Sequence, residues 1–291
     1  MPAARGASGA ERMLRQRLIS AAILIPVVVL VLFLGQPWLG LLILIVAFLA
    51  AREVFPLLRG AGIASEPLLG VAIAVVIAAG GWLLSDAISE TWILVGLGVI
   101  IAAIGAFLRP DPREGFQVWL GTVFGAIYIG MLGFLLLIVE HAPRMPAAAP
   151  FAPWLGAGQA WLVVCVLGVW AFDSGAYAAG RTWGRRGFMT HISPKKTLEG
   201  VIGGVVVATI VTGLTLWAAG ANPIGAIALG PLIAIAAQAG DLAESLLKRA
   251  AGAKDSGALI PGHGGMLDRV DSIIFAAPIV YFYILILGSL T

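Results

Sequence analysis

The feature of this sequence that most constrains its fold is a succession of apolar blocks, each about as long as a bilayer is thick. A helix needs about 20 apolar residues to cross the hydrocarbon core. Nine such blocks occur in 291 residues, more than a water-soluble core of that size could bury. They cover residues 18–35, 38–56, 67–85, 91–108, 117–140, 157–180, 198–219, 223–243 and 270–290.

The composition agrees with a membrane protein. Hydrophobic residues make up 60% of the chain and charged residues 11%, with a mean hydropathy of +1.01. A soluble domain is about half apolar and about a quarter charged. Inside a bilayer the backbone polar groups must be satisfied within the segment, so the blocks must be helices. We therefore predict an all-α polytopic membrane protein with about nine transmembrane helices.

The basic residues predict the orientation of these helices. Cytoplasmic loops of membrane proteins carry an excess of Lys and Arg. With a cytoplasmic N-terminus, nine spans leave only Arg144 of the 18 basic residues on the outer side. The first apolar block resembles the core of a signal peptide, but it is long and lacks a small-x-small cleavage site, which favours a retained span. We expect a multi-pass protein of the cell inner membrane.

Polar residues divide the chain into three regions. Residues 1–17 form a basic cytoplasmic tail, residues 18–160 hold spans one to five, and residues 161–291 form a catalytic region with spans six to nine. The spans before residue 160 are almost purely apolar, whereas after residue 170 charged residues occur within or at the ends of the spans, at the predicted cytoplasmic face. An ionisable group in a membrane segment costs about 2.5–3.5 kcal/mol or more, so such residues are functional candidates.

Three further features have simple interpretations. The one cysteine, Cys165, lies in an apolar run and is interpreted as a core residue. The segment 141–156 contains four prolines and is predicted to be an extended surface loop without regular structure. Pairs of glycines four residues apart, such as Gly121 with Gly125 and Gly200 with Gly204, predict close helix packing.

The first polar cluster lies near the inner end of the sixth block. Asp173 and Tyr177 are one helical turn apart and share a face. A functional carboxylate is favoured here, and the alternative is a structural carboxylate paired with a buried arginine.

The segment that follows leads from a basic loop into the next span. Ser193 is predicted to cap that helix and Pro194 to occupy its first position. Free backbone N–H groups and two lysines, Lys195 and Lys196, favour phosphate binding at a helix N-terminus. A patch that only anchors anionic lipid is the alternative.

The richest segment joins the eighth and ninth spans. Asp241, Glu244, Ser245 and Lys248 are spaced i, i+3, i+4 and i+7, which predicts a polar stripe on one helix face. A glycine-rich loop follows, and its histidine, taken alone, is more often structural than catalytic. Carboxylates with little His and no Cys favour Mg²⁺. Lysines and arginines beside them favour phosphates. The residues alone thus predict a magnesium-dependent reaction on a phosphorylated substrate at the cytoplasmic interface.

The 27 residues from Ser245 to Asp271 resemble the diagnostic motif of phosphatidate cytidylyltransferases. The Asp173 cluster and residues 193–200 also resemble elements of that family, in the same order, whereas residues before 170 share only hydropathy with it. The matching motif positions are Ser245, Lys248, Arg249, Lys254, Asp255, Gly257, Ile260, Pro261, Gly262, His263, Gly264, Gly265, Asp268, Arg269 and Asp271.

The resemblance implies a nine-helix homodimer that makes CDP-diacylglycerol and pyrophosphate from CTP and phosphatidic acid, in phospholipid biosynthesis. It also implies that Asp241 and Asp268 hold Mg²⁺, with K⁺ as a candidate second cation. We expect Glu244 as a further metal ligand, and no nucleic-acid partner. The expected catalytic residues are Asp241, Asp268, Lys248 and Asp271, and the expected substrate-binding residues are Ser193, Lys195, Lys196, Thr197, Lys254, His263, Arg269 and Asp173.

Two other functions stay open at this point. One is a cytidylyltransferase or kinase that acts on another lipid, such as an isoprenoid ether lipid or a polyprenol, because the motif says little about lipid tails. The other is a transporter of an anionic solute, since intramembrane charges and glycine-broken helices are typical of transporters too. Charges at one interface and the lack of repeated halves argue against transport.

Overall fold

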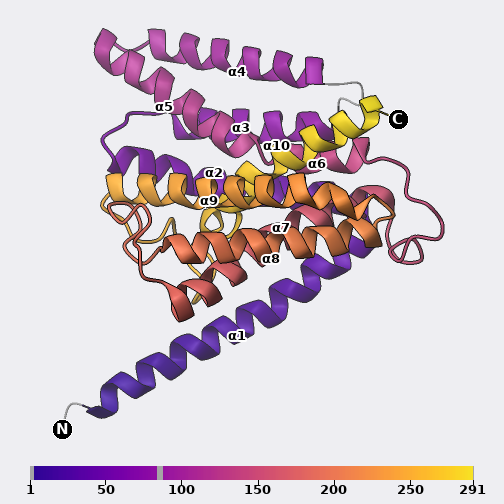
Figure 1. The fold of residues 1–291 in the computed structure, drawn as a ribbon. Helices are drawn as coiled ribbons and strands as arrows, with labels where there is room; N and C mark the ends of the chain where they lie inside the picture. The colour runs from indigo at the N-terminus through magenta and orange to yellow at the C-terminus, as the bar shows by residue number, and fades with distance from the viewer. Residues whose placement is uncertain (1–2, 84–87, 291) are drawn as a thin grey trace.

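The computed structural model describes the backbone of residues 3–83 and 88–290, and side chains within 18–20, 22–83, 92–286. Within these residues every regular element is a helix (Figure 1). The helices are α1 (Ala3–Leu34), α2 (Trp38–Gly60), α3 (Pro67–Leu83), α4 (Ile88–Phe107), α5 (Pro112–Gly130), α6 (Gly133–His141), α7 (Ala157–Trp183), α8 (Leu198–Ala218), the short 3₁₀ helix η1 (Pro223–Gly225), α9 (Ala226–Ala250) and α10 (Leu267–Leu290).

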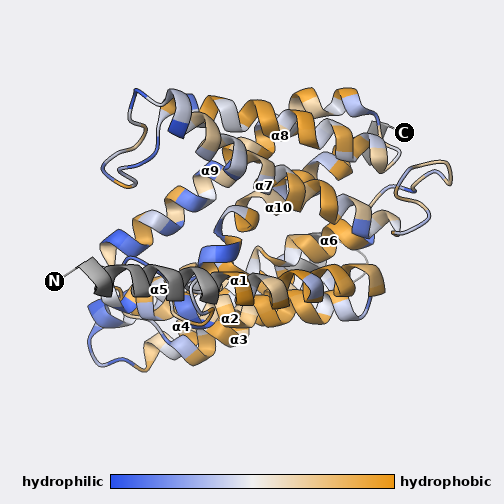
Figure 2. Cartoon of the chain, turned by 90° about the horizontal axis from the view of Figure 1, so that it is seen from below, coloured by the Kyte–Doolittle hydropathy of each residue, from blue (hydrophilic) through white to orange (hydrophobic). Residues whose placement is uncertain are grey.

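Six of the described helical segments are long and apolar enough to cross a membrane. Three more apolar segments, 18–34, 67–83 and 92–107, are shorter. The all-helical membrane fold is therefore confirmed, whereas the count of nine spans and the orientation stay predictions. Figure 2 shows apolar residues along the helices and hydrophilic residues gathered in loops at the helix ends. The six segments are 38–60, 112–141, 157–183, 198–218, 223–250 and 267–286.

Helix α1 diverges from the rest of the bundle (Figure 1). It begins at Ala3, so the backbone of the predicted N-terminal tail is helical, while the tail's side chains lie outside the described residues. Contacts tie α1 to α7 and to the loop before α10. Gln159 Nε2 donates to the Leu32 carbonyl at 3.0 Å, and Ser20 Oγ lies 2.7 Å from His263 Nδ1.

The predicted fifth span consists of two helices. Asp111 caps α5 by accepting a hydrogen bond from the Arg113 N–H at 2.9 Å, so the helix begins before residue 117. Helix α5 ends at Gly130 and α6 begins at Gly133, yet the segment 112–141 still reads as one membrane-spanning unit. The break leaves the direction of the chain across the bundle unchanged.

Glycines let the helices approach closely, as their spacing predicts. A Cβ on Gly204 of α8 would lie 2.7 Å from the Phe172 ring of α7, and one on Gly200 would lie 2.9 Å from the Ala176 carbonyl. Real Cβ atoms do not make contacts this short, so these positions require glycine. Gly125 packs against the Phe55 ring in the same way, and Gly121 packs on the Ala64 carbonyl. Cys165 is fully buried in the core, as expected.

One glycine contact brings the polar ends of α9 and α10 together. A Cβ on Gly240 would overlap the carbonyl of Asp271 and lie 3.0 Å from the Ser272 Cα. Asp241 follows Gly240 directly, so this close packing places the polar stripe of α9 beside the first turns of α10.

The predicted cap of α8 is wrong. Thr197, and not Ser193, is the N-cap, since its backbone is extended and its Oγ accepts from the Gly200 N–H at 3.2 Å. Residues before it fold back on the preceding loop instead of joining the helix. Glu199 Oε2 holds that loop by accepting from the backbone N–H groups of Arg185 at 3.0 Å and Arg186 at 3.1 Å.

The segment 142–156 is also less extended than its prolines predict. It folds as successive turns, with the Ala149 N–H donating to the Pro146 carbonyl at 2.9 Å. The Phe151 N–H donates to the Ala218 carbonyl at 2.9 Å and so ties this loop to the end of α8. A free carbonyl at a helix C-terminus supplies the partner that fixes the loop.

Candidate active site

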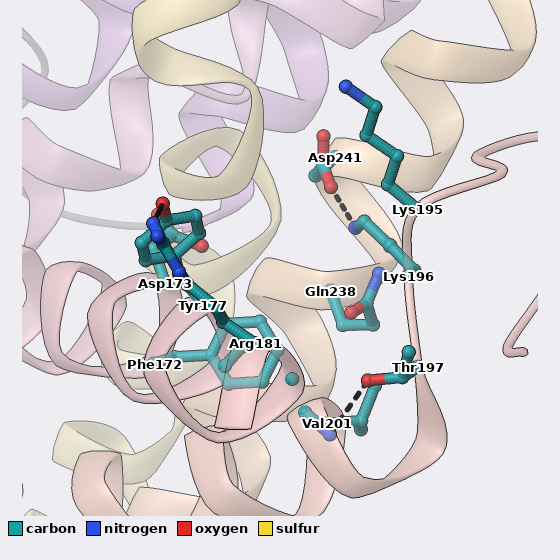
Figure 3. A pocket seen from close by; sticks show the side chains of 13 residues that line it. Phe172, Asp173, Tyr177, Arg181, Lys195, Lys196, Thr197, Val201, Gln238 and Asp241 are labelled. Atoms are coloured by element: carbon teal, nitrogen blue, oxygen red, sulfur yellow. Dashed lines mark hydrogen bonds and ion pairs between the residues drawn. The ribbon is translucent and has the colours of Figure 1, made fainter. Parts of the chain in front are cut away.

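A cavity of about 370 Å³ lies where α7, α8 and α9 meet the loop before α8; we call it the α7–α9 pocket. Figure 3 shows its side chains converging from these elements. The pocket combines cations, carboxylates and neutral polar groups at the ends of apolar helices. Its polar lining residues are Asp173, Tyr177, Arg181, Lys195, Lys196, Thr197, Gln238 and Asp241.

Lys196 is the innermost cation of the pocket. Its side chain is 21% exposed and its ammonium forms an ion pair with Asp241 (Figure 3). Burial lowers the pKa of Lys196 to about 8, against the opposing effect of the Asp173 and Asp271 carboxylates. Lys195 and Arg181 are exposed at the same pocket, and Arg181 Nη1 donates to Tyr177 Oη at 2.9 Å. The pocket therefore presents three basic side chains, of which Lys196 is the least hydrated.

Gln238 lines the pocket one helical turn before Asp241. Its residue exposure is 6%, yet within the described part of the chain its Nε2 has no hydrogen-bond partner. A buried donor without a partner costs about 1–3 kcal/mol. Such a group in a polar cavity is available to a ligand that supplies an acceptor. The sequence analysis did not select Gln238, although an amide one turn from Asp241 in an otherwise apolar span is a signal for it.

A second group of charges lies further along the same face of α9. Lys248 Nζ is 2.5 Å from Glu244 Oε2 and 2.6 Å from Asp268 Oδ1. Glu244, Lys248 and Asp268, here called the Lys248 cluster, have side-chain exposures of 1%, 11% and 8%. The predicted stripe on α9 is thus helical as expected, and its cation joins α9 to α10.

Asp268 is further held by the loop before α10. Its Oδ2 accepts hydrogen bonds from the Ser256 N–H at 3.0 Å and the Gly265 N–H at 2.8 Å, and it lies 2.8 Å from Ser256 Oγ. Asp268 itself lies in the first turn of α10. The carboxylate therefore fixes the glycine-rich loop and the start of the last helix relative to each other.

Asp271 connects the pocket with the Lys248 cluster. Its carboxyl group faces Glu244 on one side. Its charge also acts on Asp173 and Lys196 of the pocket. The charge of Asp271 therefore acts on residues of both groups.

Comparison with known proteins identifies this arrangement. Residues 15–287 match the model of the cytidylyltransferase family. The chain belongs to that family. It is 34% identical to the phosphatidate cytidylyltransferase of Synechocystis sp., over 94% of this chain and 97% of the relative. It is 34% identical to that of Haemophilus influenzae, over 94% and 100%. It is also 37% identical to chloroplastic phosphatidate cytidylyltransferase 4 of Arabidopsis thaliana, over 81% and 64%.

The expected residues of this cytidylyltransferase are only partly brought together. Asp173, Lys195, Lys196, Thr197 and Asp241 line the pocket. Lys248, Glu244 and Asp268 form the cluster. Arg269 is exposed and its charge acts on Asp173.

Besides Arg269, three expected substrate-binding residues lie outside both groups. Ser193 lies in a turn, in which its backbone N–H donates a hydrogen bond to the Met189 carbonyl at 3.0 Å. Lys254 is exposed. His263 contacts Ser20 of α1.

The acidic residues of the cytidylyltransferase suit a hard cation in their chemistry. Glu244 Oε1 is buried and has no partner among the described atoms. However, in the part of the chain that the structure describes, no three acidic, His or Cys side chains lie close enough to hold an ion. Asp241 is paired with Lys196, whereas Glu244 and Asp268 share Lys248. The predicted magnesium site therefore stays a prediction.

One residue of the N-terminal region also reaches this part of the cytidylyltransferase. Glu53 of α2 accepts hydrogen bonds from the Met266 and Leu267 N–H groups, both at 2.9 Å. The sequence analysis missed it, because the motifs all lie after residue 170. A lone acidic residue near one end of an apolar span is the signal that would have found it.

Proposed function

We propose that this chain transfers the cytidylyl group of CTP to phosphatidic acid, giving CDP-diacylglycerol and pyrophosphate for phospholipid biosynthesis. The α7–α9 pocket carries the proposal, because it places three basic side chains and a free buried amide at the ends of membrane helices. A basic pocket at the ends of membrane helices suits two phosphate-bearing substrates, one dissolved in water and the other a membrane lipid. The relatives named phosphatidate cytidylyltransferase support the same reaction.

The reaction joins two anions, so its main difficulty is electrostatic. A phosphatidate oxygen bonds to the α-phosphorus of CTP while the bond from that phosphorus to the β-phosphate bridging oxygen breaks, and pyrophosphate leaves. The phosphatidate oxygen is already anionic at neutral pH and needs little base catalysis. Positioning and charge stabilisation then dominate, as in other phosphoryl transfers.

The residues of the pocket divide this task by their position. Lys196 and Lys195 would hold the triphosphate, and Arg181 offers a planar fork that suits a phosphate. Gln238 Nε2 would donate to a CTP oxygen and so gain the partner that it lacks in the protein. Asp241 keeps the Lys196 ammonium in place until phosphate oxygens compete for it.

We propose Asp241, Asp268 and Glu244 as the residues that hold Mg²⁺, with K⁺ as the candidate second cation. A bound magnesium ion would neutralise charge on the leaving pyrophosphate. Asp271 would support the ligands from beside Glu244.

The finer topology belongs to the same proposal. We expect nine spans in the cell inner membrane, a cytoplasmic pocket and a homodimer. Because Cys165 is buried, single cysteines can be introduced in a Cys165→Ala background and labelled from outside with a membrane-impermeant maleimide. Arg144→Cys should react in intact spheroplasts and Arg185→Cys only after lysis. The reverse pattern would show that the orientation is inverted.

An assay with labelled CTP tests the reaction and separates it from its alternatives. Purified protein receives phosphatidic acid, Mg²⁺ and K⁺ with CTP labelled at either the α- or the γ-phosphorus. Cytidylyl transfer places only the α-label in lipid, whereas a lipid kinase places only the γ-label there. Parallel assays with a polyprenol, a polyprenyl phosphate and an isoprenoid ether lipid test the other lipid classes. Label in none of the lipids, from folded protein, would contradict the proposal, and solute uptake into vesicles without CTP would favour transport.

A further inference from the structure

Glu53 lies in α2, which contributes no residue to the α7–α9 pocket or the Lys248 cluster. Its carboxylate nevertheless accepts three hydrogen bonds from residues 256–267. Two come from the backbone N–H groups of Met266 and Leu267, and one comes from Ser256 Oγ at 2.9 Å. These partners are more than 200 residues away along the chain. The contact therefore depends on the tertiary fold and not on local sequence.

The two backbone hydrogen bonds fix the start of α10. The first N–H groups of a helix have no partner within the helix. Glu53 satisfies those of Met266 and Leu267, and its negative charge interacts favourably with the positive end of the helix dipole. Asp268 is the next residue. The direction of its side chain therefore depends on how Glu53 holds the start of this helix.

The third hydrogen bond reaches Asp268 through Ser256. Ser256 Oγ is 2.9 Å from Glu53 Oε2 and 2.8 Å from Asp268 Oδ2, and Ser256 is buried. A hydroxyl has one proton, so it donates to one of these two oxygens at a time. When the Asp268 oxygen is engaged elsewhere, the hydroxyl can turn to Glu53, and no buried donor loses its partner.

The glycines of the motif leave the space that Glu53 occupies. A Cβ on Gly257 would lie 2.7 Å from Glu53 Oε1, and one on Gly265 would overlap both the Glu53 carboxylate and Ser256 Oγ. The loop that contains Gly257 and Gly265 therefore packs around the Glu53 side chain of α2. A side chain at either position would displace the Glu53 carboxylate from its present place.

We propose that Glu53 is a positioning residue for cytidylyl transfer, which orients Asp268 through the first turn of α10 and through Ser256. The inference rests on the proposed function. It extends the active site to the N-terminal region, where the sequence has no recognisable motif.

The test compares Glu53→Gln with Glu53→Asp and Ser256→Ala in the full-length protein. Glutamine places an NH₂ group against donors that need an acceptor, so we expect kcat to fall about 10- to 100-fold, with the KM for CTP little changed. Aspartate keeps the charge and should restore part of kcat. Ser256→Ala keeps the two backbone hydrogen bonds of Glu53 and should lower kcat less than Glu53→Gln.

Hydrogen–deuterium exchange supplies a measurement that needs no turnover. The amides of residues 265–268 should exchange faster in Glu53→Gln than in wild type, while those of α7 stay unchanged. Glu140→Gln is the matched control, because Glu140 is also a glutamate near a helix end, and within the described residues it accepts a single hydrogen bond, from Gln36 Nε2 at 3.4 Å. It should leave kcat and exchange at 265–268 unchanged.

Each outcome bears on the inference. A wild-type kcat in folded Glu53→Gln would overturn it, as would faster exchange at 265–268 without any loss of kcat. If Glu53→Gln does not fold, Ser256→Ala decides, and a wild-type kcat there removes the link to Asp268. A wild-type protein that makes no CDP-diacylglycerol would instead refute the proposed function, and the exchange result would still report whether Glu53 orders the loop.

Discussion

The α7–α9 pocket and the Lys248 cluster both contain lysines and carboxylates, yet they use them differently. In the pocket, Lys195 and Arg181 are exposed and Gln238 holds a buried amide without a partner. In the cluster, Lys248 bridges two carboxylates and Asp268 accepts hydrogen bonds on both of its oxygens. The donors of the pocket remain available to hydrogen-bond acceptors of a bound substrate, whereas the charged groups of the cluster are largely paired with each other and with the protein backbone.

This difference separates binding from orientation. A partly hydrated cation can exchange its partner for a substrate phosphate at modest cost. A buried ion pair resists such exchange, because an unpaired buried charge is strongly unfavourable. Substitutions in the pocket should therefore change substrate affinity, and substitutions in the cluster should change turnover. The following predictions test that division.

The largest effect is expected for Asp268→Asn. Asparagine is similar in size, so the protein should fold and insert into the membrane. Its amide cannot form an ion pair with Lys248 or accept hydrogen bonds at both side-chain positions, so kcat should fall about 10²- to 10³-fold. Turnover measured with labelled CTP, beside a size-exclusion profile of the same preparation, checks this. Near-normal turnover would contradict both the role of the cluster and the proposed metal ligand.

A smaller effect is expected for Lys196→Ala. Loss of the contact between this partly buried ammonium and a CTP phosphate should cost about 2 kcal/mol or more, which corresponds to a rise of roughly 30-fold in the KM for CTP. Lys195→Ala, at the exposed neighbouring lysine, should raise KM less, and Lys196→Arg should keep most of the affinity. Equal effects of the two alanine variants would show that burial of Lys196 has no special role.

The pH dependence offers an independent measurement of the same lysine. Above its pKa of about 8, Lys196 loses its charge, so kcat/KM for CTP should fall about tenfold per pH unit. Lys196→Arg should lack this alkaline fall, because arginine stays charged.

The stability of the protein should respond to pH in the opposite direction. The pKa of Lys196 is below its ordinary value of 10.5, so the unfolded chain binds more protons between pH 8 and 10.5. The contribution of this residue to the free energy of unfolding therefore rises with pH over that range. Parallel falls of activity and thermal stability, in wild type but not in Lys196→Arg, would refute this assignment.

The smallest effect is expected for Gln238→Leu. Loss of one hydrogen bond to CTP should raise its KM about tenfold, since such a bond contributes about 1–1.5 kcal/mol. The melting temperature should stay the same or rise, because the amide has no protein partner within the described residues. Thr212→Val is the matched control, since Thr212 Oγ1 is also buried without a described partner but does not line the pocket. It should leave KM unchanged.

Much of the fold can be predicted from sequence, because the hydropathy of one continuous segment is enough to predict a membrane helix. The apolar blocks coincide with described helices, and the spacing of Asp241, Glu244 and Lys248 gave their common face on α9. The cap of α8 was wrong because Ser193 and Thr197 are both good capping residues. Only the fold of the preceding loop, held by Glu199, decides between them.

The composition of the site is harder to predict, because its contacts join distant segments. Helical spacing indicates which residues share a face, but not which partner they meet. The pairing of Lys196 with Asp241 spans 45 positions, and that of Glu53 with Leu267 spans 214. Gln238 belongs to no motif, and its position one turn from Asp241 does not reveal that its buried Nε2 has no partner among the described residues.

The hold of Glu53 on the start of α10 has a consequence for biosynthesis. Helix α10 leaves the ribosome after α1 to α9, and it carries Asp268 and Asp271. Helices α1 to α9 can therefore insert into the membrane while the catalytic centre is still incomplete. Completion requires the newest segment to dock on one of the oldest, α2. A chain interrupted before residue 267 has the pocket lysines but cannot assemble the Lys248 cluster, so an unfinished protein should consume no CTP.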